Sequence, residues 1–309
     1  MQSNTPHMRW LPKTRKDLSP ETLRIIKEVL NKIPKLPISV RKIIEMAADM
    51  DIGAKELAEV ALTDPVLSSK ILTMVNSAYY SLNRKIDDLR VAIVLIGFNA
   101  VRNLAIQDRF LQMLGEGEDA SLYDRERLWI HSYLVSVCAE SFASPDDPRR
   151  SGILMTQGIL HDIGKFALYV MGTLMRKKGV KLVYAGGKDA SMNLLRKEEQ
   201  VFGVNHTVIG GMLGNKWNLS ERVCSALEFH HHPSFFTTRE IPPACLEDVS
   251  IISVADFLVN RFLGEPTDIP EPQRPFLDAL GLKRPLDSLL TDKLKAKLEK
   301  GREFVGSLA

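Results

Sequence analysis

Histidines are unevenly spread along this chain, because six of the seven lie between residues 131 and 232. Three stand alone in apolar stretches and three are consecutive in the segment CSALEFHHHP: His131, His161, His206, His230, His231 and His232. A single histidine on an apolar helix is more often a core residue than a ligand. Several of them, together with carboxylates, predict a site for a first-row divalent metal ion, which takes imidazole and carboxylate ligands.

Two aspartates accompany these histidines. Asp256 lies in SIISVADFLVN with apolar neighbours on both sides, where an ionised carboxylate is costly unless it is paired. The alternative is that it faces solvent or caps a neighbouring backbone. Asp162 directly follows His161, and adjacent helical residues point about 100° apart, so this pair could straddle one ion or serve two. Lys165, one turn further on, could face a bound phosphate or lie on the surface.

Helical periodicity dominates the elements that must position these side chains. The helices expected to carry them span residues 123–143, 151–172, 190–202, 205–217, 220–231 and 246–263. Gly158 and Gly164 either relieve crowding near the backbone or are packing glycines. No convincing strand alternation occurs, so the fold class is predicted to be all-α.

The sequence of the N-terminal half also predicts helices. Asp64 is expected to cap a helix whose first residue is Pro65. Two apolar helices meet at Gly97, which favours an apolar helical hairpin over a DNA-binding helix-turn-helix. Residues 1–18 are predicted to be a flexible basic tail with solvated side chains at Arg9, Lys13, Arg15 and Lys16.

Composition excludes several functional classes. The net charge of +3 over 309 residues is too small to indicate a nucleic-acid partner. The three cysteines lie far apart and form no C-x-x-C pair, so neither a disulfide framework nor a thiolate metal site is expected. No uncharged apolar stretch of about eighteen residues occurs, and the N-terminus is not a secretory signal. These features predict a cytoplasmic protein without a membrane partner.

The order of the candidate ligands resembles that of the HD metal-dependent phosphohydrolase superfamily. More narrowly, the chain resembles HDOD-domain proteins, which are bacterial signalling modules related to that superfamily. The resemblance covers roughly residues 30–235, and its motifs are KLPISV, TDPVLSSKILTMVNSAYYS, AIVLIGFNAVRNLAI, HDIGK and FGVNHTVIGGMLGNKWNLSERVCSALEFHHHP. It implies a multi-helix bundle of the HD/HDOD type and a role in cytoplasmic signalling, often without catalysis, because many HDOD proteins have lost their ligands.

The resemblance also implies roles for individual residues. One divalent ion would be held by His131, His161, Asp162 and Asp256, and a second by Asp162 as the bridge with His206, His230 and His231. Iron and manganese fit such a site best, with zinc, nickel and cobalt as alternatives. Asp162 and Lys165 would be the catalytic residues of an enzyme. His232 has no counterpart and is expected to lie behind the ligands or to be exposed.

Relatives of the HD-GYP type, which hydrolyse cyclic di-GMP, differ in two places. The segment HHHPSFF stands where their Gly-Tyr-Pro motif should follow the paired histidines. Arg127 replaces their additional carboxylate one turn before His131, and residues four apart share a helix face, so this cation would oppose a third metal ion. Turnover of cyclic di-GMP is therefore not expected.

Four segments are predicted: the tail (1–18), an N-terminal helical half (19–120), a metal-binding half (121–263) and a C-terminal linker with helices packed on the core (264–309). The predicted function is an HDOD-type regulatory protein that retains a complete, dinuclear metal site. Its partner would be a signalling protein, a nucleotide or another phosphorylated small molecule. The alternative is an active metal-dependent phosphohydrolase or phosphodiesterase that acts on a phosphoester.

Overall fold

A computed structural model describes most of the chain, namely residues 10–46, 53–80, 82, 84–114, 125–144, 147–180, 193–236, 240–264, 269–282 and 285–306. These residues form α-helices and short 3-10 helices, and none of them lies in a strand. The all-α prediction is confirmed.

Six helices form the N-terminal part: α1 (Pro20–Lys32), α2 (Ile38–Met46), α3 (Ala54–Leu62), α4 (Pro65–Val75), α5 (Leu89–Ile96) and α6 (Phe98–Leu114). Short 3-10 helices, η1 (Arg15–Asp17) and η2 (Ala78–Tyr80), accompany them. The carboxylate of Asp64 accepts a hydrogen bond from the backbone N–H of Leu67 at 3.1 Å, and Pro65 is the first residue of α4. The predicted cap is confirmed.

Gly97 turns the chain between α5 and α6, but it does not make the predicted hairpin. The φ angle of Gly97 is +83°, in the region that glycine adopts most readily. The two helices are bent by 101° relative to each other, so they diverge instead of packing side by side. Among the described residues, no single helix has both the length and the apolar composition to cross a membrane. The bent pair α5 and α6 meets these two criteria only when the two helices are counted together.

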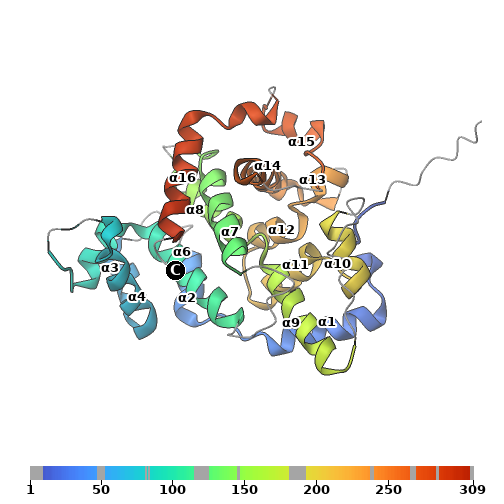
Figure 1. The fold of residues 1–309 in the computed structure, drawn as a ribbon, viewed down its shortest axis with the longest axis horizontal. Coiled ribbons are helices and arrows are strands. Elements are labelled where there is room, and N and C mark those ends of the chain that lie inside the picture. The colour runs from blue at the N-terminus through green and yellow to red at the C-terminus, as the bar shows by residue number, and fades with distance from the viewer. Residues whose placement is uncertain are drawn as a thin grey trace, which may run out of the picture.

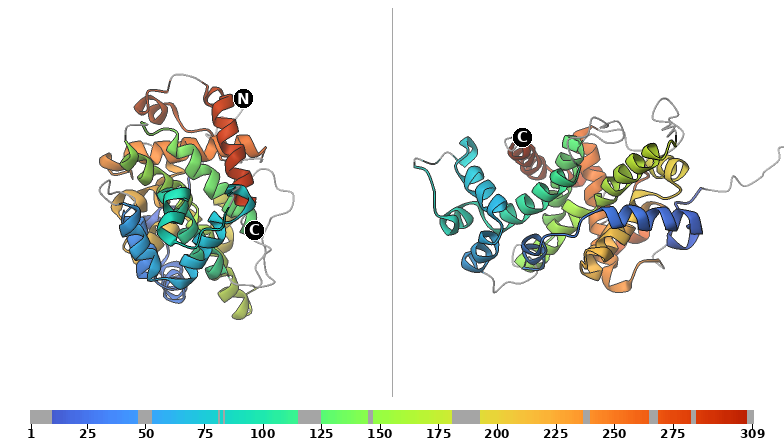
Figure 2. Two further views of the ribbon diagram at one scale, coloured as in Figure 1. Left: turned by 90° about the vertical axis from the view of Figure 1, so that its left-hand side faces the viewer. Right: turned by 90° about the horizontal axis from the view of Figure 1, so that it is seen from below.

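The C-terminal part contains the helices with the candidate ligands: α7 (Arg125–Glu140), α8 (Pro148–Leu160), α9 (Ile163–Lys177), α10 (Leu194–Phe202), α11 (His206–Lys216), α12 (Glu221–Phe229), α13 (His232–Phe235) and α14 (Leu246–Leu263). The chain ends with α15 (Arg274–Ala279) and α16 (Asp292–Gly306), and includes the 3-10 helices η4 (Pro243–Cys245) and η5 (Leu286–Leu289). Figures 1 and 2 show α3 and α4 at one end of the molecule and α10 at the other.

Two apolar clusters hold these helices together. One joins the N-terminal helices to α9 and α11, and it includes Ile26, Ile71 and Phe166. The other packs α7 against α14 and α16 through Leu134, Ile252 and Leu298, which are fully buried. The candidate ligands lie on helices of both clusters, so the site is built where the clusters meet. The division into four segments stays a prediction.

The single helix predicted over residues 151–172 is wrong, because α8 and α9 are separated by His161 and Asp162. Asp162 has φ −95° and ψ 11°, outside the helical region. A Cβ atom on Gly164 would lie 1.8 Å from the carbonyl oxygen of His206, and one on Gly158 would lie 2.6 Å from the Cα of Ser136. Both glycines therefore allow close helix packing. Because of the break, α8 can pack against α7 while α9 packs against α11.

Two of the four basic side chains of the predicted tail contact the rest of the protein. The backbone N–H of Lys13 donates to Glu199 at 2.6 Å, and its side chain donates to the carbonyl oxygen of Gly203 at 3.1 Å. Arg15 forms an ion pair with Glu228 at 2.5 Å, so the solvated roles predicted for Lys13 and Arg15 are wrong. The side chain of Lys16 is 82% exposed, as predicted. Arg9 lies outside the described residues.

Candidate metal centre

Seven predicted ligand side chains converge at one place in the C-terminal part. His131 comes from α7, His161 and Asp162 from the junction of α8 and α9, and His206 from the start of α11. The remaining three are His230 and His231 at the end of α12 and Asp256 on α14. None of the seven is more than 7% exposed. Helices scattered over the sequence thus bring imidazoles and carboxylates into one buried cluster.

The first group of ligand atoms surrounds one oxygen of Asp162. The Nε2 atom of His161 lies 3.3 Å from Asp162 Oδ2, and that of His131 lies 3.8 Å from the same oxygen. Asp256 closes this group, because its Oδ1 is 2.9 Å from His131 Nε2 and 3.9 Å from His161 Nε2. His131, His161 and Asp162 can each offer an atom within 4.8 Å of the others, which is compatible with a shared metal ion.

The second group contains His206, His230 and His231, whose ligand atoms also lie within 4.8 Å of one another. The other oxygen of Asp162, Oδ1, is 3.3 Å from His206 Nε2 and 3.8 Å from His230 Nε2. The two oxygens of this carboxylate therefore face different histidine groups. That arrangement suits a carboxylate that bridges two cations.

Hydrogen bonds from the Nδ1 atoms fix the orientation of three rings. His161 is bonded to the carbonyl oxygen of Gly158 at 2.7 Å, and His230 to that of Ala226 at 3.1 Å. His206 is bonded to the carboxylate of Glu198 at 2.7 Å. When Nδ1 donates the proton, Nε2 carries the lone pair, as is usual for histidines that bind metals. All three Nε2 atoms point into the cluster.

A cation would satisfy polar atoms that are otherwise buried without a partner. His161 Nε2 and Asp162 Oδ1 are both buried, and neither has a hydrogen-bond partner among the described residues. Such atoms are rare because burial without a partner costs free energy. Both groups consist of nitrogen and oxygen donors without a thiolate. The residues therefore fit a first-row divalent metal ion.

The charges of Asp162, His230 and His231 also suit a cation. Burial would raise the pKa of Asp162, but His161, Lys165 and His206 hold it well below the usual value. Burial lowers the pKa of His231 to about 3 and that of His230 well below the usual value. Asp162 is therefore ionised and the rings of His230 and His231 are neutral near pH 7. These are the protonation states in which such groups bind a metal.

Lys165 lies beside the candidate metal centre and not on the surface. Its Nζ atom is 2.5 Å from Asp162 Oδ2, and its side chain is only 14% exposed. The pair is formed within the first turn of α9, where residues three apart share a face. Lys165 thus places a positive charge next to the bridging carboxylate, within reach of an anion bound there.

His232 lies outside both ligand groups. Its ring stacks on Phe236 at 4.6 Å between ring centroids and contacts the edge of Phe229 at 4.8 Å. The side chain is buried, and burial lowers its pKa to about 4. The prediction that His232 could be exposed is wrong, and its role in the structure is aromatic packing.

Sequence reasoning missed two residues that hold the ligands in place. Glu198 on α10 is fully buried and accepts hydrogen bonds from both the backbone N–H and the ring of His206. Asn260 donates to Asp256 Oδ1 at 2.9 Å from one turn further along α14. The spacing of four residues could have identified Asn260. Nothing in the sequence distinguishes Glu198 from its neighbour Glu199.

These features define a class: an all-helical protein with a buried histidine–aspartate centre. The HDOD domain family model matches residues 33–233. The chain therefore belongs to the HDOD domain family.

Solved structures share this fold. An HDOD domain protein of unknown function from Geobacter sulfurreducens is 22% identical and superposes with a TM-score of 0.64 over 94% of this chain and 98% of its own. A candidate signal transduction protein from Marinobacter aquaeolei VT8 gives 0.68 at 17% identity, over 93% of this chain and 66% of its own. A candidate metal-dependent phosphohydrolase from Shewanella amazonensis SB2B gives 0.58 at 15% identity, over 92% and 98%.

One curated relative also matches in sequence. It is an uncharacterized protein from Treponema pallidum (strain Nichols), 24% identical over 256 residues. The match covers 82% of this chain and 47% of the relative. The chain thus spans about half the length of that protein.

Proposed function

We propose that this HDOD protein is a cytoplasmic regulatory protein whose buried centre holds two divalent metal ions. One ion would be bound by His131, His161, Asp162 and Asp256, and the other by Asp162, His206, His230 and His231. Iron and manganese suit this donor set best, with zinc, nickel and cobalt as alternatives. The observation that carries the proposal is the position of Asp162, whose two oxygens face separate histidine groups.

Burial of the ligands favours a regulatory role over turnover. All seven are at most 7% exposed. The crevice that reaches His231 and Asp256 has a volume of about 10 Å³, and its lining includes Pro270 and Pro272. That volume is about the space of a single water molecule, whereas ligand pockets usually exceed about 300 Å³. The small volume of this crevice supports a centre that is closed to a substrate along this edge.

A phosphohydrolase is the second candidate, and Lys165 is the observation in its favour. Two divalent ions, when bound, supply Lewis acidity that activates water and neutralises phosphate charge. Asp162 would help hold both ions, and Lys165, which lies beside it, would bind a phosphate oxygen. The candidate phosphohydrolase among the solved structures shares the fold. We rank this function second because of the burial of the centre.

We predict that the protein, purified without a chelator, carries about two transition-metal ions per chain, because its donor set is mixed nitrogen and oxygen. Elemental analysis by mass spectrometry checks this number. A protein that is purified empty and takes up no metal on reconstitution would contradict the proposal.

An activity panel separates the two candidate functions. The metal-loaded protein should show no turnover of phosphomonoesters, nucleotides or cyclic dinucleotides, including cyclic di-GMP. Robust hydrolysis of any of them that is abolished in His161→Ala would establish the phosphohydrolase instead. Absence of turnover would support the regulatory function. The partner of the regulatory protein would then be a signalling protein or a phosphorylated small molecule that binds without reaction.

A further inference from the structure

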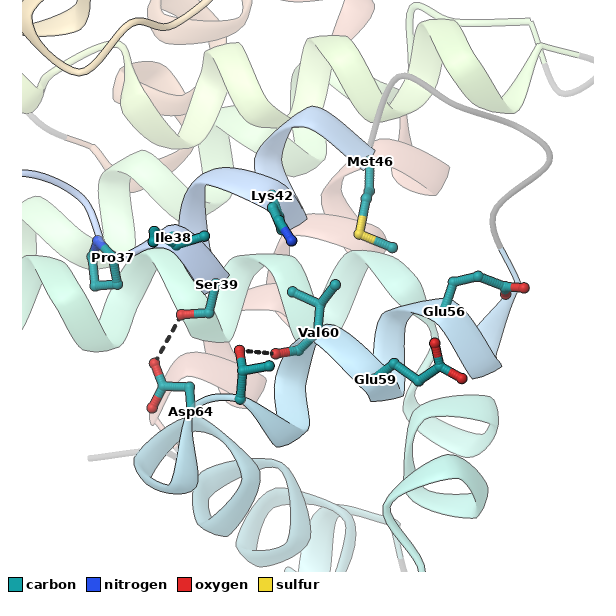
Figure 3. Close-up of a pocket in the computed structure, with 10 residues that line it drawn as sticks. Pro37, Ile38, Ser39, Lys42, Met46, Glu56, Glu59, Val60 and Asp64 are labelled. Atoms are coloured by element: carbon teal, nitrogen blue, oxygen red, sulfur yellow. Dashed lines mark hydrogen bonds between the residues drawn. The ribbon is translucent and has the colours of Figure 1, made fainter.

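A groove lies between α2 and α3, on the N-terminal part of the molecule that contributes none of the seven candidate ligands (Figure 3). Its volume is about 640 Å³. Ile38 and Met46 line it from α2, and Glu56, Glu59 and Val60 line it from α3. On α3 these positions fall at i, i+3 and i+4, so they form one face of the helix.

Part of the groove lining is apolar, through Ile38, Met46 and Val60. Ile38 is 66% exposed, although it is a large apolar side chain. Of the ten large apolar side chains that are exposed among the described residues, eight lie between residues 38 and 95, and one of these, Ile38, lines the groove. A groove with apolar side chains in its lining can take up the apolar face of a partner helix. Met46 adds a flexible, polarizable side chain that can adapt to different partners.

The groove is also acidic, in contrast to the chain as a whole. The charged residues that line the groove are one base, Lys42, and three acids, Glu56, Glu59 and Asp64. The net charge of the groove is therefore −2, from one positive and three negative groups. The full chain carries +3. Figure 3 shows that the carboxylate of Asp64 accepts a hydrogen bond from Ser39. Glu56 accepts a hydrogen bond from the backbone N–H of Gly53 at 3.0 Å, and both Glu56 and Glu59 are exposed. The partner that complements this groove is therefore basic as well as apolar.

We propose that the groove binds a basic amphipathic helix of a partner protein. Apolar side chains spaced at i, i+3, i+4 and i+7 would cover Ile38, Met46 and Val60. Lysine or arginine on the flanks would pair with Glu56 and Glu59. The groove helices α2 and α3 have nine residues each, or about 13 Å of helix, which matches two to three turns of the partner. This binding does not depend on the metal centre.

Fluorescence anisotropy with the full chain tests the proposal. The probe is a labelled synthetic helix of about four turns, built only from leucine and lysine with the leucines on one face. We expect a Kd on the order of 10 μM. Ile38→Asp and Glu59→Lys should each weaken binding about tenfold, equivalent to about 1.4 kcal/mol. The matched controls Val180→Asp and Glu303→Lys, which alter exposed residues elsewhere, should leave the Kd unchanged.

Several results would overturn the proposal. The Leu/Lys helix could fail to bind, it could bind the groove variants and the control variants equally, or a Leu/Glu helix could bind as tightly. Sedimentation could also show a dimer that Ile38→Asp dissociates, in which case a second copy of this chain occupies the groove. Thermal unfolding followed by circular dichroism verifies that each variant is folded. If Ile38→Asp does not fold, the binding measured with Glu59→Lys tests the proposal, because that substitution alters only an exposed side chain.

Discussion

Glu198 acts at the scale of a single residue. Its buried carboxylate holds the ring of His206 through Nδ1 and the start of α11 through a backbone N–H. The result is that His206 presents Nε2 to Asp162 at 3.3 Å. A carboxylate in this position fixes the tautomer of a metal-binding histidine and increases its basicity.

We therefore predict that Glu198→Ala lowers metal affinity about 10- to 100-fold. Competition with a chromophoric chelator measures the change. Glu199→Ala is the matched control, because Glu199 bonds to Asn205 and Lys13 and not to a ligand. An equal loss of affinity in both variants would mean that the helix as a whole, and not Glu198, supports the site.

Asp256 and His232 give a second prediction at this scale. Asp256→Asn removes a charge that lies 2.9 Å from His131, so we expect most of the bound metal to be lost. His232→Ala removes an aromatic contact outside both ligand groups, so we expect it to keep its metal and to lower the free energy of unfolding by about 1–3 kcal/mol. Elemental analysis compares the two, and equal metal retention would contradict the assignment of Asp256.

At the scale of elements, the contact between α9 and α11 sets the geometry of the centre. The helices approach so closely at Gly164 that a Cβ atom there would overlap the carbonyl oxygen of His206. Asp162 lies directly before α9, and His206 is the first residue of α11. The distance between two candidate ligands therefore depends on a glycine that touches no metal.

Gly164→Ala should separate the two helices. We expect a loss of about 1–3 kcal/mol in the free energy of unfolding, as for other overpacked cores, together with weaker metal binding. Chemical denaturation and chelator competition measure the two effects. Gly306→Ala is the control, since a Cβ atom there meets nothing within 4 Å. Wild-type metal affinity in Gly164→Ala would show that the centre tolerates movement of α9.

The same elements show what the sequence could and could not reveal. Periodicity and capping located most helices, because the apolar face and the Asp64 cap are local features. Spacing and resemblance selected side chains that do converge, because buried imidazoles and carboxylates stand out in apolar helices. The break at His161 and Asp162 escaped detection, because it depends on how α8 and α9 pack against different neighbours. The ion pair of Arg15 with Glu228 is equally a tertiary contact with no local signal.

At the scale of the whole molecule, bound metal would act as a cross-link between five parts of the chain. Ions that bind only the folded state stabilise it by about 2.7 kcal/mol when the free metal concentration is a hundred times the Kd. We predict that metal-loaded protein melts at least about 4 °C above chelated protein. Calorimetry measures the difference. Asp256→Asn should show little shift, and an unchanged Tm in the wild type would contradict tight binding to the native state.

The order of the ligands along the chain has a consequence for synthesis. His131 is the first ligand to be made and Asp256 the last, 125 residues later, since 256 − 131 = 125. At about 5–20 residues per second, a ribosome needs about 6–25 s to cover that interval. During this time the growing chain carries several imidazoles without the helix α14 that completes their enclosure. A metal centre made of all seven candidate ligands could therefore be completed only late in translation, and the emerging histidines would be open to competing ions until α14 docks.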